Sequence, residues 1–244
     1  MRIEIESLRT LPEIRTGDNL AALIREAARR EEQLIDRSVV VAVAQKIVSK
    51  AERAVVDLKN LQPSPLAAQW ATEWNKDPRL IELILMQSRR IVKMDRGVLI
   101  AETQHGFVCA NAGVDQSNAG ADDFALVLPP DPDASAERLR EGLGCGAVIV
   151  TDTFGRPWRE GLVDVAIGIS GLEPLEDHRG SVDRDGRKLS STIVAVADQL
   201  AAAAGLVMRK AEGCPVALIH GLEWQAGRGN IAALLRSPDQ DLFR

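Results

Sequence analysis

Two stretches of the sequence each place an aspartate beside small, hydroxyl or amide side chains and glycines. Asp115 precedes Ser117 and Asn118 in NAGVDQSNAG, and Asp152 precedes Thr153 in VTDTFGRPWREG. Such oxygens at the ends of buried strands suit Mg²⁺ or Mn²⁺, ions that often bridge to the phosphates of a substrate. An aspartate beside glycine more commonly forms an Asx turn or caps a helix, and the spacing alone favours that interpretation. A metal site and a pair of turns therefore both stay open.

Basic side chains near these aspartates are candidates for binding phosphate oxygens. Lys46 and Lys50 follow the apolar run SVVVAVAQ four residues apart, so one helical turn would bring both to the same side. Ligands gather at such strand ends in α/β proteins, but a solvated lysine face fits the spacing equally well. Arg156 and Arg159 flank Trp158 in a turn that could clamp a carboxylate or phosphate. The alternative is a pair of surface arginines with Trp158 packed beneath them.

The hydrophobic pattern predicts the elements that must position these side chains. Apolar runs with β-branched residues or alternation predict strands at 2–8, 38–45, 97–103, 106–113, 124–128, 146–153, 164–170 and 215–221. Helical spacing predicts helices at 19–34, 64–90 and 190–208, and a short helix within 230–243 that Pro238 ends. Asp18 is predicted to cap the first of these, and a further helix is predicted to follow a cap near Asp133. Residues 172–190 are polar and are predicted to form a loop.

The order of these elements predicts the fold class. The strands do not alternate with helices as simple βαβ units, so we expect an α+β fold with mixed or antiparallel sheets and flanking helices. A length of 244 residues suits a single unit over 1–244 or two closely joined subdomains.

Composition and the motifs that are missing exclude several classes of function. A net charge of −5 and an aromatic content of 3% give no case for binding nucleic acid or an anionic membrane. The sequence has no P-loop motif, its GLGCGA stretch has the wrong glycine spacing for a dinucleotide fingerprint, and its three histidines lack zinc-ligand spacing. We therefore expect neither nucleic acid nor membrane as a partner.

The cysteines and the N-terminal residues bear on the compartment. Cys109, Cys145 and Cys214 are widely separated and form no C-x-x-C pair, so we expect buried thiols in a reducing compartment. The first 14 residues lack the apolar core of a signal peptide, and no apolar run reaches the roughly 18 residues of a membrane span. The protein is expected to be cytoplasmic.

Six stretches in this order resemble the coenzyme F(420)-0:γ-glutamyl ligase family. They are LPEI, QKIVSKAE, HGFVCANAGVDQSN, VTDTFGRPWREG, DRDGRKL and ADQLAAAAGLVMRKAEGCPV, and the likeness covers nearly the whole chain. The resemblance implies a ligase that forms a carbon–nitrogen bond, attaching L-glutamate to coenzyme F(420)-0 with conversion of GTP to GDP and phosphate. An acyl phosphate would be the intermediate, and further γ-linked glutamates would be an extension of the same reaction.

The resemblance also assigns roles to individual residues. It implies guanine-nucleotide contacts at Leu11, Pro12, Glu13, Ile14, Gln45, Lys46, Lys50, Asn118, Met208, Arg209, Lys210, Ala211, Glu212 and Gly213. It implies divalent-metal ligands at Asp115, Asp152 and Thr153, with two Mg²⁺ or Mn²⁺ sites and K⁺ as a further ion. Arg156 and Arg159 are predicted as substrate contacts from the two guanidiniums of their turn. Many relatives have a hydroxyl residue where Gln45 stands, and some have Gly-Gln where Arg209 and Lys210 stand, so Lys210 is not expected to bind metal.

The family further implies an unusual, family-specific α+β fold and an intertwined homodimer. Because the sequence stops at PDQDLFR, we expect no C-terminal nitroreductase-like domain of the kind that some relatives carry. Two alternatives stay open: a diverged GTP-dependent ligase acting on another phosphorylated acid or amino acid, and a non-catalytic nucleotide-binding module that regulates a partner. Two intact metal aspartates favour an enzyme.

Overall fold

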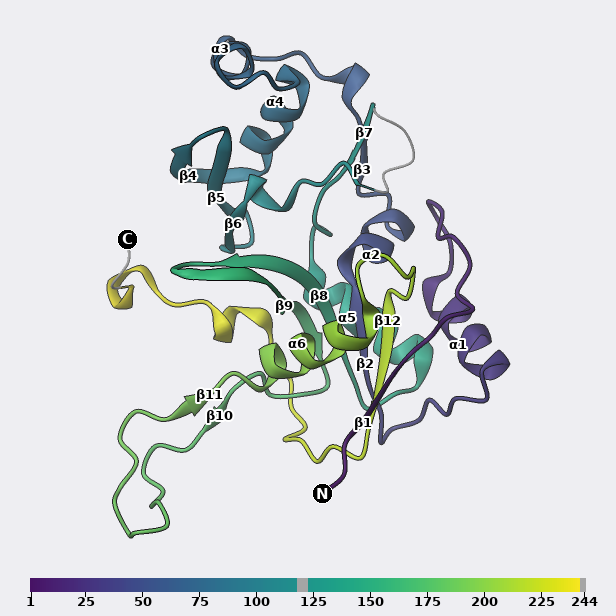
Figure 1. Cartoon of the computed structure of the whole chain (residues 1–244). Coiled ribbons are helices and arrows are strands. Elements are labelled where there is room, and N and C mark those ends of the chain that lie inside the picture. Colours follow the sequence, from purple (N-terminus) through teal and green to yellow (C-terminus); the bar gives the residue numbers. More distant parts are fainter. Residues whose placement is uncertain (118–122, 242–244) are drawn as a thin grey trace.

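A computed structural model describes residues 1–117 and 123–241, and a mixed sheet forms the centre of this part of the chain (Figure 1). Its strand order is β1-β12-β2-β8-β9, with bounds Glu4–Ser7, Val216–His220, Val40–Ala44, Ala147–Arg156 and Arg159–Ser170. Only β2 and β8 pair in parallel within this sheet, and the other neighbours are antiparallel. The expected α+β class with mixed sheets is therefore confirmed.

The inner strands of this sheet consist of apolar residues that water does not reach. Residues 40–43 of β2, 147–150 of β8 and 216–219 of β12 are all fully buried. Continuous apolar runs of this kind are what a strand covered on both faces requires. The buried runs fix the register of β2 on β8, in which Ala44 lies opposite Thr151.

Three helices cover this sheet. Their bounds are α1 Leu20–Arg30, α5 Pro132–Leu143 and α6 Val196–Met208. Helix α5 packs against β8, β9 and α1, whereas α6 packs against β9, β1 and β12. Glycines allow both helices to approach β9 closely: a Cβ on Gly168 would lie 2.3 Å from the Pro132 carbonyl oxygen, and one on Gly205 would lie 2.4 Å from Asp164.

A second hydrophobic cluster lies beside the first, in the upper part of Figure 1. It is built from α3 Pro65–Trp74, α4 Pro78–Gln87, β4 Ser88–Asp95, β5 Val98–Thr103, β6 Val108–Ala110, β3 Val55–Asp57 and β7 Phe124–Leu126. Strands β4, β5 and β6 form one antiparallel sheet, and β3 pairs with β7 in another. The predicted hairpin between 97–103 and 106–113 is confirmed by the β5–β6 pair.

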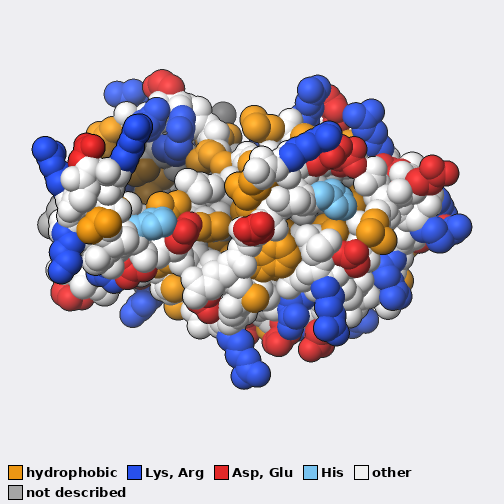
Figure 2. Space-filling model, turned by 90° about the horizontal axis from the view of Figure 1, so that it is seen from below, with side chains coloured by type: hydrophobic (Ala, Val, Ile, Leu, Met, Phe, Trp, Pro, Cys, Tyr) orange, Lys and Arg blue, Asp and Glu red, His pale blue; other side chains and the backbone are white. Residues whose placement is uncertain are grey.

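The remaining elements are short. Helix α2 spans Gln45–Ala51, strands β10 and β11 span Glu176–Asp177 and Ile193–Val194, and 3₁₀ helices η1 to η4 span Leu58–Asn60, Asn111–Gly113, Ile231–Leu234 and Pro238–Gln240. Strands β10 and β11 pair at the base of an arm that extends away from the body (Figure 1). On the face seen from below, acidic and basic side chains are interspersed around apolar ones (Figure 2). In the described part of the chain, no helix is long and apolar enough to cross a membrane.

One of the two predicted helix caps is wrong by one residue, and the other lies near the predicted position. The Asn19 side chain, and not that of Asp18, accepts from the Ala22 N–H at the start of α1, while Asp18 accepts from the Arg15 N–H. At α5 the cap is Asp131, whose carboxylate accepts from the Ala134 N–H. Adjacent Asx residues compete for one capping position, and sequence pattern alone cannot rank them.

Four predicted element boundaries also need correction. Residues 64–90 form two helices, broken at Asn75 in left-handed conformation, followed by a strand from Ser88. The helix predicted from 190 begins at 196, because the β-branched pair Ile193–Val194 joins the arm as a strand. The predicted loop 172–190 contains β10, and Pro238 starts a 3₁₀ turn instead of ending a helix, which proline favours at a first helical position.

Asp133 has a different role from the predicted cap, because it ties three elements together. Its carboxylate accepts from the backbone N–H of Ile169 in β9 at 2.8 Å and from that of Ile231 in η3 at 3.1 Å. Burial raises the pKa of Asp133, while the two N–H groups act in the opposite direction.

Replacing Asp133 tests this connection. We expect Asp133→Ala to lower the free energy of unfolding by about 1–3 kcal/mol, because two backbone donors lose their acceptor. Asp133→Asn keeps an acceptor and loses less. The raised pKa means that the folded state binds this proton more tightly, so the contribution of the wild-type carboxyl is present at low pH and declines as pH rises through the folded pKa. The free energy of unfolding of Asp133→Asn should therefore increase relative to that of the wild type as the pH rises.

Urea unfolding of the wild type and both variants between pH 4 and pH 8 measures these differences. Asp239→Ala, at an exposed residue of η4, is the matched control and should unfold like the wild type. Equal unfolding midpoints for Asp133→Ala and the wild type would show that the carboxylate does not support the fold.

Candidate functional site

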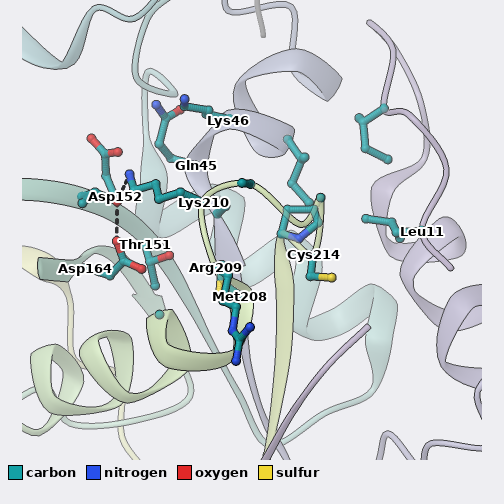
Figure 3. A pocket seen from close by; sticks show the side chains of 18 of the residues that line it. Leu11, Gln45, Lys46, Thr151, Asp152, Asp164, Met208, Arg209, Lys210 and Cys214 are labelled. Carbon is teal, nitrogen blue, oxygen red and sulfur yellow. Dashed lines mark hydrogen bonds between the residues drawn. The ribbon is translucent and has the colours of Figure 1, made fainter. Parts of the chain in front are cut away.

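A cavity of about 850 Å³ lies where β2 and β8 end side by side (Figure 3). Because parallel strands end at the same edge, the residues that follow Ala44 come next to those that follow Thr151. The segment before α1 and the segment after α6 complete the wall. Predicted site residues that line the cavity are Leu11, Pro12, Glu13, Ile14, Gln45, Lys46, Lys50, Asp152, Thr153, Met208, Arg209, Lys210, Ala211 and Gly213.

The two predicted lysines both reach the cavity from helix α2. The Lys46 ammonium lies 2.7 Å from Asp115 Oδ2 and donates to Ser117 Oγ at 2.5 Å. The Lys50 ammonium donates to Glu13 Oε1 at 2.5 Å, and the Lys50 side chain is largely buried. Both lysines therefore line the cavity and are not on a fully solvated face. Each ammonium is neutralised by a carboxylate.

Asp115 is held beside the cavity wall by its backbone and by Lys46. It exchanges two backbone hydrogen bonds with Leu126, at 3.0 and 2.7 Å. Burial acts to raise its pKa, but hydrogen bonds from Lys46 and Ser117 outweigh burial and hold the pKa of Asp115 below its usual value. Asp115 is therefore a paired, ionised carboxylate.

Asp152 lies in a different environment. Burial raises the pKa of Asp152 to about 6, against a hydrogen bond from the Thr153 N–H and the charges of Lys210 and Lys46. The charge of Asp115 raises it further, which means that these two carboxylates are close enough to repel each other. A bound cation would stabilise the ionised form of Asp152, because it would offset both the burial of this carboxylate and its repulsion from Asp115.

The hydroxyl of Thr153 connects two further charged groups. It donates to Asp164 Oδ1 and accepts from the Lys210 ammonium at 2.6 Å. Asp164 is a cavity residue that the sequence did not reveal as part of the site. It lies opposite Thr153 in the β8–β9 pairing, after register shifts that no sequence pattern indicates.

Asp115, Asp152 and Thr153 offer oxygen donors of the kind that a divalent cation prefers. Two carboxylates and a hydroxyl are hard oxygen ligands, and the repulsion between the carboxylates favours a cation between them. Among the described residues, no group of three His, Cys, Asp or Glu side chains is arranged to hold a metal by itself. The residues fit an ion that shares its coordination with water and phosphate, as Mg²⁺ does.

Other predicted site residues lie outside the cavity wall. Arg156 and Arg159 flank the tip of the β8–β9 hairpin, where Arg156 donates to the Glu160 and Gly161 carbonyls of its own turn. Trp158 is 79% exposed, so packing of Trp158 beneath them is wrong. Glu212 pairs with Arg209 at 2.7 Å. Asn118 lies outside the described residues.

The backbone that leads to Asp115 adopts an uncommon conformation. Asn111 and Ala112 both have positive φ, 53° and 51°, and Gly113 follows with φ of 72°. This conformation is strained in non-glycine residues, and such strained residues concentrate at functional sites. The glycine is required here for a second reason, because a Cβ would lie 2.7 Å from the Leu128 side chain.

The three cysteines are buried free thiols, as predicted. Burial raises the pKa of Cys109 to about 12, with a smaller effect from the nearby Asp152, and raises the pKa of Cys145 to about 11. Such thiols are not ionised at neutral pH and are poor nucleophiles.

We therefore expect slow reaction of these thiols with Ellman's reagent. In the folded protein at pH 7.5, Cys109 and Cys145 should be modified at least a hundred times more slowly than in 8 M urea. Peptide mass spectrometry identifies each modified cysteine, and the urea sample is the matched control. Fast modification of Cys109 in the folded protein would show an accessible thiolate beside Asp152.

Fold and cavity together define an α+β protein with a charged site at the carboxyl end of its parallel strand pair. The chain belongs to the F(420)-0:gamma-glutamyl ligase family, whose model matches residues 9–221. It is 46% identical, over the full length of both chains, to a protein of Methanothermobacter thermautotrophicus named coenzyme F(420):L-glutamate ligase. Proteins of the same name from Methanopyrus kandleri and Methanocaldococcus jannaschii are 46% and 39% identical, over 99% and 100% of this chain and 98% and 97% of theirs.

Proposed function

We propose that this protein ligates L-glutamate to coenzyme F(420)-0, with GTP as the co-substrate and an acyl phosphate as the intermediate. The observation that carries this proposal is the convergence of Lys46, Lys50, Lys210 and Asp152 at one cavity, with Asp115 paired to Lys46 beside it. Membership of the family and the names of its relatives support the acceptor and the amino acid.

The cavity has two ends of different chemistry, which suggests how a nucleotide lies in it. Figure 3 shows Leu11 on one side and Asp152, Lys210 and Asp164 on the other. The Leu11 end offers apolar contact for the base. The other end offers ammonium groups for the phosphates, and a phosphate there would replace Asp115 and Glu13 as partners of Lys46 and Lys50.

Asp115 and Asp152 would hold Mg²⁺ or Mn²⁺, with the Thr153 oxygen as a further ligand. When bound, such an ion neutralises charge on the phosphate oxygens as the phosphoryl group is transferred. The protein's own contribution is position and charge: the lysines bind the phosphates, and the buried wall of β2 and β8 limits water near them.

The proposed reaction needs no nucleophilic side chain. The acceptor carboxylate attacks the γ-phosphorus of GTP, the bond to the bridging oxygen breaks, and GDP leaves. The α-amine of L-glutamate then attacks the acyl carbon, phosphate leaves with the electron pair of the C–O bond, and the amine loses a proton. This agrees with the buried, un-ionised thiols of Cys109 and Cys145.

Homodimer formation and a cytoplasmic location are also proposed, as the resemblance implies. The arm beyond β10 and β11 projects from the body (Figure 1) and carries exposed apolar side chains at Val182 and Ile193. An interface between two copies would cover these side chains.

Incubation with GTP, MgCl₂ or MnCl₂, L-glutamate and F(420)-0 tests the proposed reaction. Mass spectrometry should detect an acceptor heavier by one glutamyl group, together with GDP. Asp115→Asn and Asp152→Asn should each lower the rate by at least a hundredfold, because charge stabilisation at the phosphoryl group is lost.

The matched control for these two variants is Asp239→Asn, at an exposed residue of η4, which should keep the wild-type rate. Circular dichroism confirms that each variant is folded. Absence of a glutamylated product from the wild type with MgCl₂ and with MnCl₂ would refute the proposed function.

Lys50 gives a separate test of nucleotide binding. We expect Lys50→Gln to weaken GTP affinity about 10- to 100-fold, because a charge-assisted hydrogen bond contributes about 1.5–3 kcal/mol. Isothermal titration calorimetry measures the affinity, and Lys188→Gln in the exposed arm is the control. An affinity within twofold of the wild type would place the phosphates away from helix α2.

A further inference from the structure

The role of Asp164 follows from its position in β9, where this strand meets β8, helix α6 and the segment after α6. Its carboxylate accepts from Thr153 across the β8–β9 pair, and Thr153 accepts from Lys210 in the segment after α6. The Thr153 hydroxyl has one proton, which it uses in the hydrogen bond that it donates to Asp164. The oxygen of Thr153 is therefore turned toward Lys210 as an acceptor.

Helix α6 leaves room for this carboxylate at a residue that otherwise weakens a helix. Gly205 lies within α6, where glycine is about 1 kcal/mol less favourable than alanine. A Cβ at this position would lie 2.4 Å from Asp164 Oδ2. The glycine therefore admits the Asp164 carboxylate against the helix.

The turn after α6 brings Lys210 back over the hairpin. Arg209, the C-cap of α6, has φ of 41°, a conformation that a non-glycine residue rarely adopts. The chain reverses here, and the Lys210 side chain points toward Asp152 (Figure 3). Its ammonium donates to the Thr153 hydroxyl. A strained turn that holds one ammonium on the Thr153 hydroxyl, beside the Asp152 carboxylate, indicates that its position matters.

We propose that Asp164 is a positioning residue that acts through Thr153 to hold the Lys210 ammonium beside Asp152, at the phosphoryl-transfer end of the cavity. The identity of the phosphoryl group that Lys210 would contact rests on the proposed function. The contacts among Asp164, Thr153 and Lys210 do not depend on it. Lys210 supplies a fixed positive charge to the transferred phosphoryl group, and Asp164 keeps it there before the substrates bind. Charge placed in advance needs no reorganisation during the reaction.

The first test uses no activity. Limiting acetic anhydride labels lysine amines in the free protein, and mass spectrometry gives the labelling of Lys210 relative to exposed Lys188 in the same digest. Asp164→Ala should raise this ratio at least threefold, because the Thr153 oxygen is no longer turned toward Lys210. Asp164→Asn keeps an acceptor for Thr153 and should lie closer to the wild type.

A second variant moves the carboxylate without removing it. Gly205→Ala places a Cβ on the Asp164 carboxylate and favours the helix, so it should raise the labelling ratio of Lys210 in a folded protein. An unchanged ratio in both Asp164→Ala and Gly205→Ala would overturn the positioning role.

The kinetic test is a double-mutant cycle on glutamate ligation. Asp164→Ala should lower kcat at least tenfold while the KM for GTP changes less than threefold. In the Lys210→Met background the same substitution should change kcat less than threefold, because the group through which it acts is gone. Independent, multiplying effects of the two substitutions would overturn the inference.

The two sets of measurements separate this inference from the proposed function. GTP with MgCl₂ should protect Lys210 from labelling at least threefold. If the wild type makes no glutamylated product while the labelling ratio responds to Asp164→Ala and to GTP, the proposed acceptor fails and the positioning role stands. If product forms but the labelling ratio does not respond, the positioning role fails alone.

Discussion

The parallel pairing of β2 with β8 is the constraint on which the site depends. Two parallel neighbours end at the same edge, so whatever follows each strand is brought together without any further contact. Here helix α2 follows one strand and Asp152 follows Thr151 in the other. The apolar residues that bury both strands also fix their register, so the core determines which lysines face which carboxylates.

Charge balance in the cavity is the second consequence of this arrangement. Lys46 and Lys50 lie against Asp115 and Glu13, and both lysine side chains are partly buried, where an unpaired charge is costly. Asp152 has burial as the dominant influence on its pKa. The free protein thus pairs Lys46 and Lys50 with carboxylates and leaves the Asp152 carboxylate desolvated. A phosphate that carries a cation could replace the carboxylate partners of the lysines and supply the cation to Asp152.

Features that depend on a single segment of the chain could be predicted from the sequence, whereas features that depend on the pairing of two segments could not. Strands β2 and β8 were predictable because continuous apolar runs identify buried strands, and Lys46 and Asp152 follow from where those runs stop. Asp164 was not predictable, because its place opposite Thr153 depends on irregular register in the β8–β9 pair. The cap of α1 was missed for a local reason, since the neighbouring residues Asp18 and Asn19 compete for it.

Backbone strain occurs on both loops that deliver charge to this edge of the sheet. Residues 111–113 have positive φ just before Asp115, and Arg209 has positive φ just before Lys210. Strain of this kind persists only where surrounding contacts hold it. For Asp115 the holding contacts are its two hydrogen bonds to Leu126, and for Lys210 they run through Thr153 to Asp164. The sheet therefore sets the site from one side, while two strained loops, each anchored by hydrogen bonds, set it from the other.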